Sequence, residues 1–217
     1  MIQIIPAILA TTEKEYHEQL EKIISADVFQ EGWIQIDIMD NKFVQNKSIG
    51  FDVIAKYPES FKKEIQLLVE DPTNWLEQAA YIDAHFMDRV IAPVEVGALK
   101  IEKYLNKAKE LRLEVGLSVN PKTPIESLVP FVDKIRYVVI MSVEPGFQGQ
   151  QFITDALEKV KKVKSQYSLT VGVDGGINSS NVRSIVDAGA DYLAVGSGLL
   201  KGDIDANLEK FWEALSL

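Results

Sequence analysis

Short apolar runs alternate along this chain with longer segments in which apolar residues recur every three or four positions. The short runs are rich in Val and Ile, and several are apolar at successive positions. That pattern is typical of strands in a parallel sheet that is buried on both faces. Eight segments show it: residues 2–8, 33–38, 64–69, 89–94, 114–119, 137–142, 169–174 and 192–197.

Helical patterns lie between these runs. Residues 13–25 place Tyr16, Leu20, Ile23 and Ile24 on one stripe. Residues 72–82 begin with a proline, and Asp71 just before it is a suitable N-cap. We also expect helices over residues 97–111, 124–132, 154–165, 179–188 and 204–215, and at most one short helix within 49–57.

Eight strands, each followed by a helical segment, predict one closed (β/α)8 barrel, a TIM barrel, as a single domain over residues 1–217. An open doubly wound sheet is the structural alternative. It normally uses fewer strands, and its G-x-G-x-x-G turn is missing after the first strand.

Composition narrows the class of protein. The 217 residues are 47% apolar and 25% charged, which fits a well-cored domain and not a disordered chain. The absence of cysteine excludes disulfides and thiolate metal sites and favours a reducing cytoplasm. The N-terminus lacks the basic start of a signal peptide, and no apolar run is long enough for a membrane helix. A net charge of −9 disfavours nucleic acid as a partner.

Two aspartates end strands on nearly opposite sides of the predicted barrel. Active sites of such barrels form at the carboxyl ends of the strands, where Asp37 and Asp174 fall. One carboxylate could remove a proton from a carbon while the other delivers one to the opposite face. The alternative is that each aspartate only caps a loop or the following helix.

Three glycine-bearing segments also fall at strand ends, late in the chain. They are EPGFQGQ (144–150), DGGI (174–177) and GSGL (196–199). Backbone N–H groups of such loops can hold an anion without any cation, and barrels often bind phosphate after strands seven and eight. The three segments together predict a phosphorylated ligand.

Histidine is scarce. His17 falls within the first predicted helix and His85 in the turn before the fourth strand, so both are expected at the surface. With no imidazole and no thiol at the cavity, a tetrahedral zinc site of the usual kind cannot form.

The chain resembles the ribulose-phosphate 3-epimerase family along its whole length. The matching segments, in order, are PAIL (6–9), W-I-x-I-D-I-M-D-N-x-F-V-x-N (33–46), LVEDP (68–72), GLSVNPKTP (116–124), MSVEPGFQGQ-x-F (141–152), VDGGI (173–177) and AGADYLAVGS (188–197).

The resemblance implies a barrel of the ribulose-phosphate-binding type and a pentulose or hexulose phosphate that is inverted at carbon 3. Asp37 and Asp174 would serve as acid and base across an enediolate. Met39 and Met141 would line the enediolate pocket, and a homo-oligomer is expected. The phosphate would lie on Gly146, Phe147, Gln148, Gly149, Gly175, Gly176, Gly196 and Ser197.

The sequence departs from the family pattern where the family binds its metal. Gln35 and Gln66 stand at the two histidine positions. Ala7 replaces a serine, Pro93 replaces a histidine, and Gln148 replaces a glycine of the phosphate loop. Both acids and most of the phosphate cradle are retained.

These changes leave the metal open. With Asp37 and Asp174, the amide oxygens of Gln35 and Gln66 could hold a weak hard cation, Mg²⁺ or Mn²⁺ more readily than Zn²⁺. Without a metal, the two carboxylates repel and one tends to keep its proton at neutral pH. Lys42 or Lys47 could then replace the metal as electrophile, unless both are solvated loop lysines.

Three functions therefore remain at this point. The first is a sugar-phosphate epimerase with an altered or absent metal site. The second is a phosphosugar-binding protein that has lost its chemistry. The third is another phosphosugar lyase or isomerase, although the related synthases and decarboxylases carry a Lys two residues after the second-strand Asp and this chain has Met39 there.

Overall fold

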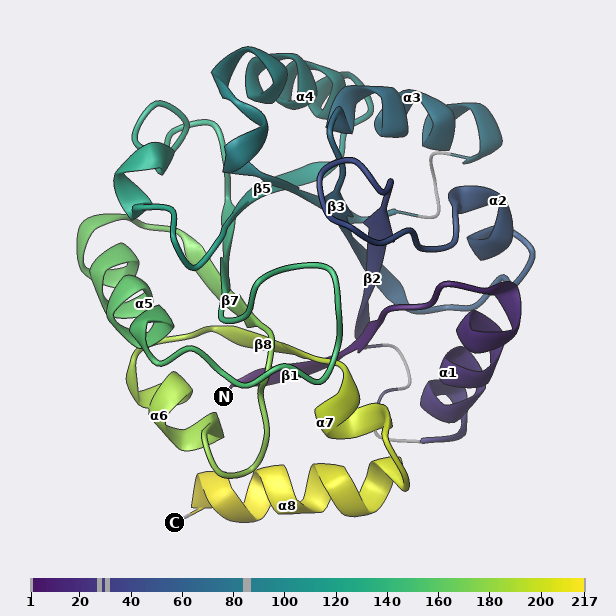
Figure 1. Ribbon diagram of the computed structural model, residues 1–217, viewed down its shortest axis with the longest axis vertical. Helices are drawn as coiled ribbons and strands as arrows, with labels where there is room; N and C mark the ends of the chain where they lie inside the picture. The colour runs from purple at the N-terminus through teal and green to yellow at the C-terminus, as the bar shows by residue number, and fades with distance from the viewer. Residues whose placement is uncertain (1, 27–28, 30–31, 84–86, 217) are drawn as a thin grey trace.

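The computed structural model describes residues 2–26, 29, 32–83 and 87–216. Eight parallel strands form a closed barrel in chain order, and β8 pairs with β1. Figure 1 looks down into the barrel, with the helices arranged around its outside. The strands are β1 (Gln3–Ile8), β2 (Trp33–Met39), β3 (Lys62–Leu68), β4 (Arg89–Pro93), β5 (Glu114–Val119), β6 (Tyr137–Met141), β7 (Thr170–Asp174) and β8 (Tyr192–Val195).

All eight predicted strands are confirmed, and the closed barrel excludes the open doubly wound sheet. The successive apolar positions have a simple cause. One side of each strand packs against the surrounding helices and the other fills the barrel, so nearly every strand residue is buried.

The longer helices begin and end close to where the sequence predicts. Tyr16, Leu20 and Ile23 are buried as expected, but Ile24, expected on the same stripe, is 41% exposed. Asp71 accepts a hydrogen bond from the N–H of Thr73 at 3.1 Å. Among the described helices, none is long and apolar enough to cross a membrane. They are α1 (Glu13–Ser25), α2 (Phe51–Ile54), α3 (Pro72–Asp83), α4 (Ala98–Glu110), α5 (Asp155–Gln166), α6 (Val182–Asp187), α7 (Ser197–Leu200) and α8 (Ile204–Ser216).

The helix predicted over residues 124–132 is wrong, because only the 3₁₀ turn η4 (Ile125–Leu128) forms there. Pro130 has no N–H to donate, so the ladder of helical hydrogen bonds cannot continue through that position. A second 3₁₀ turn, η3 (Val94–Val96), begins at the last residue of the strand expected over 89–94. The short helix α7 directly after β8 was not predicted.

His17 lies on the exposed side of α1 and stacks on Tyr57 with ring centroids 4.8 Å apart, so its surface position is confirmed. His85 lies outside the described residues.

A buried ion pair lies at the end of the barrel where the strands begin. Nε of Arg89 lies 2.5 Å from Oε2 of Glu64, and the guanidinium also stacks over the rings of Trp33, Tyr137 and Tyr192. The hydroxyl of Tyr192 donates to Glu64 at 2.8 Å. Burial raises the pKa of Glu64 to about 6, although Arg89 and Tyr192 favour its charged form.

We expect Arg89→Met to destabilise the fold by about 3–5 kcal/mol, because it leaves the Glu64 carboxylate buried without its partner. In the unaltered protein the pKa of Glu64 is about 6 and Arg89 favours the charged form, so the loss should grow as the pH rises above about 6 and the acid ionises. Urea denaturation at pH 5 and pH 8 measures both effects. The double variant Arg89→Met/Glu64→Gln should recover most of the loss, and equal losses in the single and double variants would contradict the assignment.

Candidate active site

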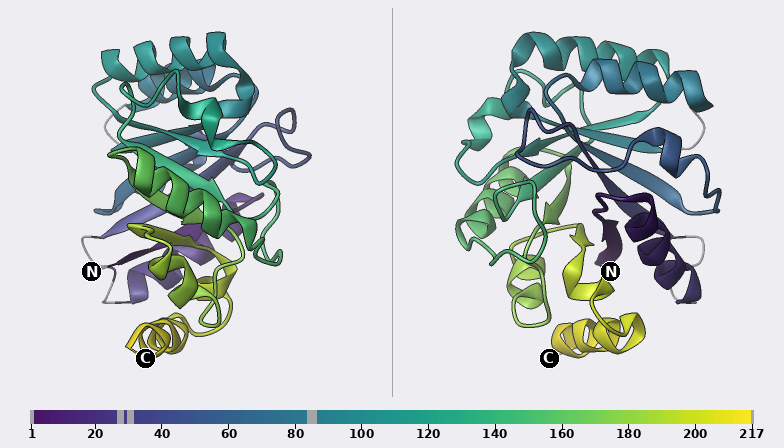
Figure 2. Two further views of the ribbon diagram at one scale, coloured as in Figure 1. Left: turned by 90° about the vertical axis from the view of Figure 1, so that its left-hand side faces the viewer. Right: turned by 45° about the vertical axis from the view of Figure 1, so that its right-hand side comes forward.

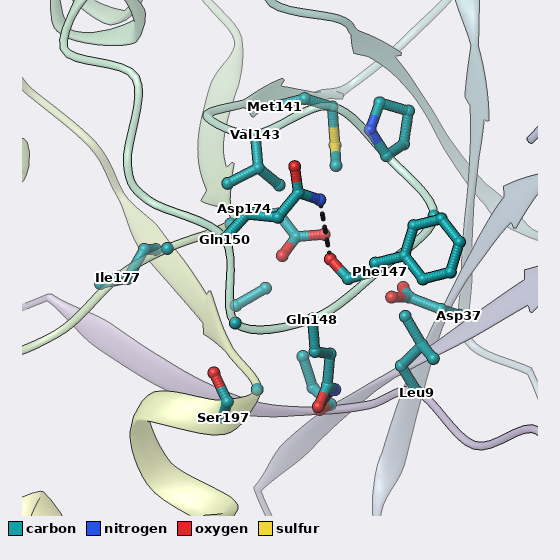
Figure 3. A pocket seen from close by; sticks show the side chains of 18 of the residues that line it. Leu9, Asp37, Met141, Val143, Phe147, Gln148, Gln150, Asp174, Ile177 and Ser197 are labelled. Carbon is teal, nitrogen blue, oxygen red and sulfur yellow. Dashed lines mark hydrogen bonds between the residues drawn. The ribbon is translucent and has the colours of Figure 1, made fainter.

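The two aspartates lie at the carboxyl ends of β2 and β7 and point into the barrel. Each is only 8% exposed, and both line the same cavity. Figure 3 shows the two carboxyl groups approaching this cavity from different strands. The sequence prediction that Asp37 and Asp174 face one cavity is therefore met by their geometry.

Two buried glutamine side chains donate hydrogen bonds to the two acids. Nε2 of Gln35 donates to Oδ1 of Asp37 at 3.1 Å and to Oδ2 of Asp174 at 3.0 Å. Nε2 of Gln66 donates to the same Oδ2 of Asp174 at 2.8 Å. Both glutamines are completely buried, and their Oε1 atoms have no hydrogen-bond partner.

Burial shifts both acids in the same direction. Burial and then the charge of Asp174 raise the pKa of Asp37 well above its usual value. Burial raises the pKa of Asp174 to about 6, although hydrogen bonds from Gln35 and Gln66 act against that shift. Near neutral pH the pair therefore favours one proton shared between two carboxyl groups, which is the state that a one-acid, one-base reaction needs.

The cavity has a volume of about 50 Å³ and contains all three glycine-bearing segments. Eleven of the predicted site residues line it, and among those predicted only Met39, Gln35 and Gln66 do not. Met39 is fully buried in an apolar cluster with Val44 and Leu68, beside the cavity. The lining residues are Ala7, Leu9, Asp37, Leu68, Met141, Val143, Pro145, Gly146, Phe147, Gln148, Gly149, Gln150, Asp174, Gly175, Gly176, Ile177, Ala194, Gly196, Ser197 and Gly198.

Backbone N–H groups face this cavity without internal partners. Within the described part of the chain, the N–H groups of Gly176 and Ser197 donate to no acceptor. Gly176 has φ +62°, and a Cβ there would lie 2.6 Å from the N of Phe152 and 2.9 Å from the O of Gln150. The turn after β7 therefore needs glycine, both for its backbone angle and for close contact with the loop after β6.

The loop after β6 lines the cavity, and the loop after β2 projects from the same edge of the barrel and contacts it (Figure 2). Nδ2 of Asn46 donates to the carbonyl of Gly146 at 2.7 Å. Asp40 holds the loop after β2 by accepting the N–H groups of Lys42, Phe43 and Glu70 at 2.8–3.0 Å. Burial raises the pKa of Asp40, but these backbone hydrogen bonds outweigh it and hold the pKa below its usual value.

Neither candidate lysine reaches the acids. Lys42 is exposed and its Nζ lies 3.9 Å from Glu70, and Lys47 is also exposed. Both are solvated loop lysines. Gln148, by contrast, extends across the cavity: its Nε2 lies 3.5 Å from the carbonyl of Ala7 and would lie 2.8 Å from a Cβ at position 196.

Some residues that shape the site were not singled out from the sequence. Asn46 belongs to a quoted motif, but nothing in the sequence indicates its contact with Gly146. Ser142 donates its hydroxyl to the carbonyls of Asp174 and Gly175 at 2.9 and 2.6 Å and so fixes the end of β7. Its position directly after a strand was the available signal.

The arrangement does not fit the divalent cation that the resemblance implies. A cation needs oxygen lone pairs that converge on one point, whereas here the amide nitrogens of Gln35 and Gln66 converge on the carboxylates. Among the described residues, no three His, Cys, Asp or Glu side chains gather closely enough to hold a metal ion.

We expect Asn46→Asp to loosen the loop over residues 144–150, because it replaces the N–H donor that holds Gly146 with a carboxylate oxygen that repels the carbonyl. Losing about 1 kcal/mol should speed amide hydrogen exchange in that loop roughly fivefold. Exchange monitored by mass spectrometry measures this. Gln45→Glu adds the same charge at the neighbouring exposed position and should leave exchange unchanged. Equal effects of the two variants would count against the contact.

A closed parallel barrel with an acid pair and glycine-bearing loops at the carboxyl ends of its strands has the architecture of TIM-barrel enzymes, whose active sites form at that end. Solved structures share this fold: 3-hexulose-6-phosphate synthase from Salmonella typhimurium is 18% identical, with a TM-score of 0.73 and 99% of both chains covered. The 3-keto-L-gulonate-6-phosphate decarboxylase from Vibrio cholerae is 13% identical, with a TM-score of 0.69 and 100% of this chain and 97% of that chain covered.

Sequence comparison gives the family. The model of the ribulose-phosphate 3 epimerase family matches residues 3–200, and the chain belongs to that family. The ribulose-phosphate 3-epimerase of Schizosaccharomyces pombe is 31% identical over 91% of this chain and 86% of its own length. That of Buchnera aphidicola is 32% identical over 90% and 86%. The chain is thus a sugar-phosphate epimerase or a relative of one, and sugar-phosphate epimerases are isomerases.

Proposed function

We propose that this protein inverts carbon 3 of a pentulose or hexulose phosphate, for example converting D-ribulose 5-phosphate to D-xylulose 5-phosphate. One observation carries the proposal: two buried carboxyl groups share the amide of Gln35 and both face a cavity lined by glycine loops. Family membership supports the substrate class.

The chemistry needs one ionised and one protonated acid. The ionised carboxylate removes the proton from carbon 3, and the electron pair moves into the neighbouring carbonyl to give an enediolate. The protonated carboxyl then delivers its proton to the opposite face of carbon 3 as the carbonyl forms again. Asp37 and Asp174 lie on different strands, which supports their acting from opposite faces of a substrate between them.

The phosphate group belongs, in this proposal, on the backbone of the three glycine-bearing segments. Gly176 and Ser197 supply N–H groups without internal acceptors, and Gly146 to Gly149 line the same cavity. Such N–H groups bind an anion through their partial positive charges, which suits a protein with a net charge of −9.

A non-catalytic phosphosugar-binding protein is the second candidate. It is favoured by one observation, that the amides of Gln35 and Gln66 already satisfy the carboxylates from below. The two candidates differ in whether carbon 3 exchanges its proton.

Asp174→Asn should abolish epimerisation and the exchange of the carbon 3 proton, because an amide cannot remove a proton. We expect a loss of at least about 10³-fold in kcat, since acid–base groups contribute roughly 10²–10⁴. Proton NMR of D-ribulose 5-phosphate and D-allulose 6-phosphate in deuterated water measures exchange at carbon 3. Asp187→Asn, an exposed acid on α6, is the control. If the unaltered protein gives no exchange with either sugar, with or without Mn²⁺ or Mg²⁺, the epimerase proposal is rejected.

Gly176→Ala should weaken binding of the sugar phosphate about tenfold, because the new Cβ would push the loop over 150–152 away from the cradle and cost about 1.4 kcal/mol of binding. Calorimetric titration with D-ribulose 5-phosphate and with inorganic phosphate measures it. Gly202→Ala imposes a similar backbone strain at φ +86° but meets nothing within 4 Å, so it controls for strain alone. Equal losses in both variants would argue against a cradle at Gly176.

A further inference from the structure

The amides below the acid pair are arranged as donors. Nε2 of Gln35 contacts both carboxylates, and Nε2 of Gln66 contacts Asp174. An ionised carboxylate only accepts hydrogen bonds, so it selects the NH₂ end of an amide. Each Oε1 is left buried and unpaired. Leaving a buried acceptor without a partner costs about 1–3 kcal/mol, so the contacts to the acids are made at the expense of the amide oxygens.

This donor arrangement is the reverse of a metal site. Turning both amides to offer Oε1 to a cation would replace three N–H···O contacts with oxygens facing the carboxylates. A cation would then have to balance the repulsion of four oxygen groups, and an amide oxygen is a weaker ligand than a carboxylate or an imidazole.

We propose that Gln35 and Gln66 are positioning residues that hold the acid pair in place of a divalent cation, so that the reaction proceeds without bound metal. The inference rests on the proposed function for its catalytic consequence. The hydrogen bonds from Gln35 and Gln66 fix the positions of Asp37 and Asp174. The partial positive charge of the amide hydrogens offsets part of the repulsion between the two carboxylates.

The second hydrogen of Gln66 supplies the other role of a cation, that of withdrawing charge from the reacting oxygen. Nε2 of Gln66 lies 3.4 Å from Sδ of Met141, and Met141 lines the cavity. A thioether is a weak acceptor, so once the Met141 side chain moves aside, the buried Gln66 N–H can donate a stronger, charge-assisted hydrogen bond to an enediolate oxygen.

Metal binding is measured first and separately from activity. The protein is purified without chelator and its metal content is determined by mass spectrometry, then titrated with Mn²⁺ and Zn²⁺ by calorimetry. We expect well below one metal per chain and no saturable binding. A divalent metal held one per chain, or removed by EDTA with loss of carbon 3 exchange, overturns the proposal.

Two variants test the amides themselves. Gln66→Met keeps the length of the side chain but removes its donors, and it should lower kcat about 10- to 100-fold with KM unchanged. Gln78→Met, an exposed glutamine on α3, is the matched control. A fall in stability with unchanged kcat would show that Gln66 is only structural and would overturn the proposal.

The double variant Gln35→His/Gln66→His should gain one tightly bound Zn²⁺ or Mn²⁺ per chain, because two imidazoles and two carboxylates form a complete ligand set. Its thermal unfolding should become metal-dependent, while that of the unaltered protein stays independent of metal. If neither protein exchanges the proton on carbon 3, the proposed function fails. The metal titrations still decide whether Gln35 and Gln66 hold the acid pair in place of a metal. Equal metal binding by both proteins would overturn that role.

Discussion

Two carboxyl groups share one small buried cavity, and the rest of the site depends on how their repulsion is balanced. Asp37 and Asp174 come from strands on different sides of the barrel, so neither local backbone nor sequence spacing sets their separation. The common donor, Gln35, does so. Ser142 fixes the backbone of Asp174, and Gln66 fixes its side chain. The acid pair is therefore held by neutral donors within the barrel.

The buried acids at the two ends of the barrel have different partners. Where the strands begin, Glu64 has a full cationic partner in Arg89, surrounded by three aromatic rings. Where they end, the acids have only amide partners, and burial raises the pKa of both. A fixed cation beside Asp174 would keep it ionised and make it a poorer acid. Partial charges leave the pair able to take up and release a proton, which suits chemistry at this end.

The pattern of apolar positions predicted the eight strands and their closure, because a strand that is buried on both faces is apolar at successive positions. It failed over residues 124–132, where Pro130 limits a segment that is otherwise amphipathic to a 3₁₀ turn. At the site, residue type and strand position were enough to bring Asp37, Asp174 and the glycine loops together. They could not show which end of the Gln35 amide faces the acids, because that depends on partners from β7. The place of Met39 in the enediolate pocket is implied by the resemblance alone and stays a prediction; in the structure Met39 packs against Val44 and Leu68.

The size of the cavity makes the covering loops part of the function. About 50 Å³ is well below the roughly 300–1,000 Å³ of typical ligand sites. The strands cannot widen it, because their ladders close the barrel. The loop over residues 144–150 lies outside these ladders: a side-chain hydrogen bond from Asn46 joins it to the loop after β2, and Phe147 within it is 57% exposed. Gln148, which lies across Gly196, moves with the same loop. A sugar phosphate bound as proposed would have to displace this loop, whereas the acids would keep their places because their donors, Gln35 and Gln66, belong to the strands.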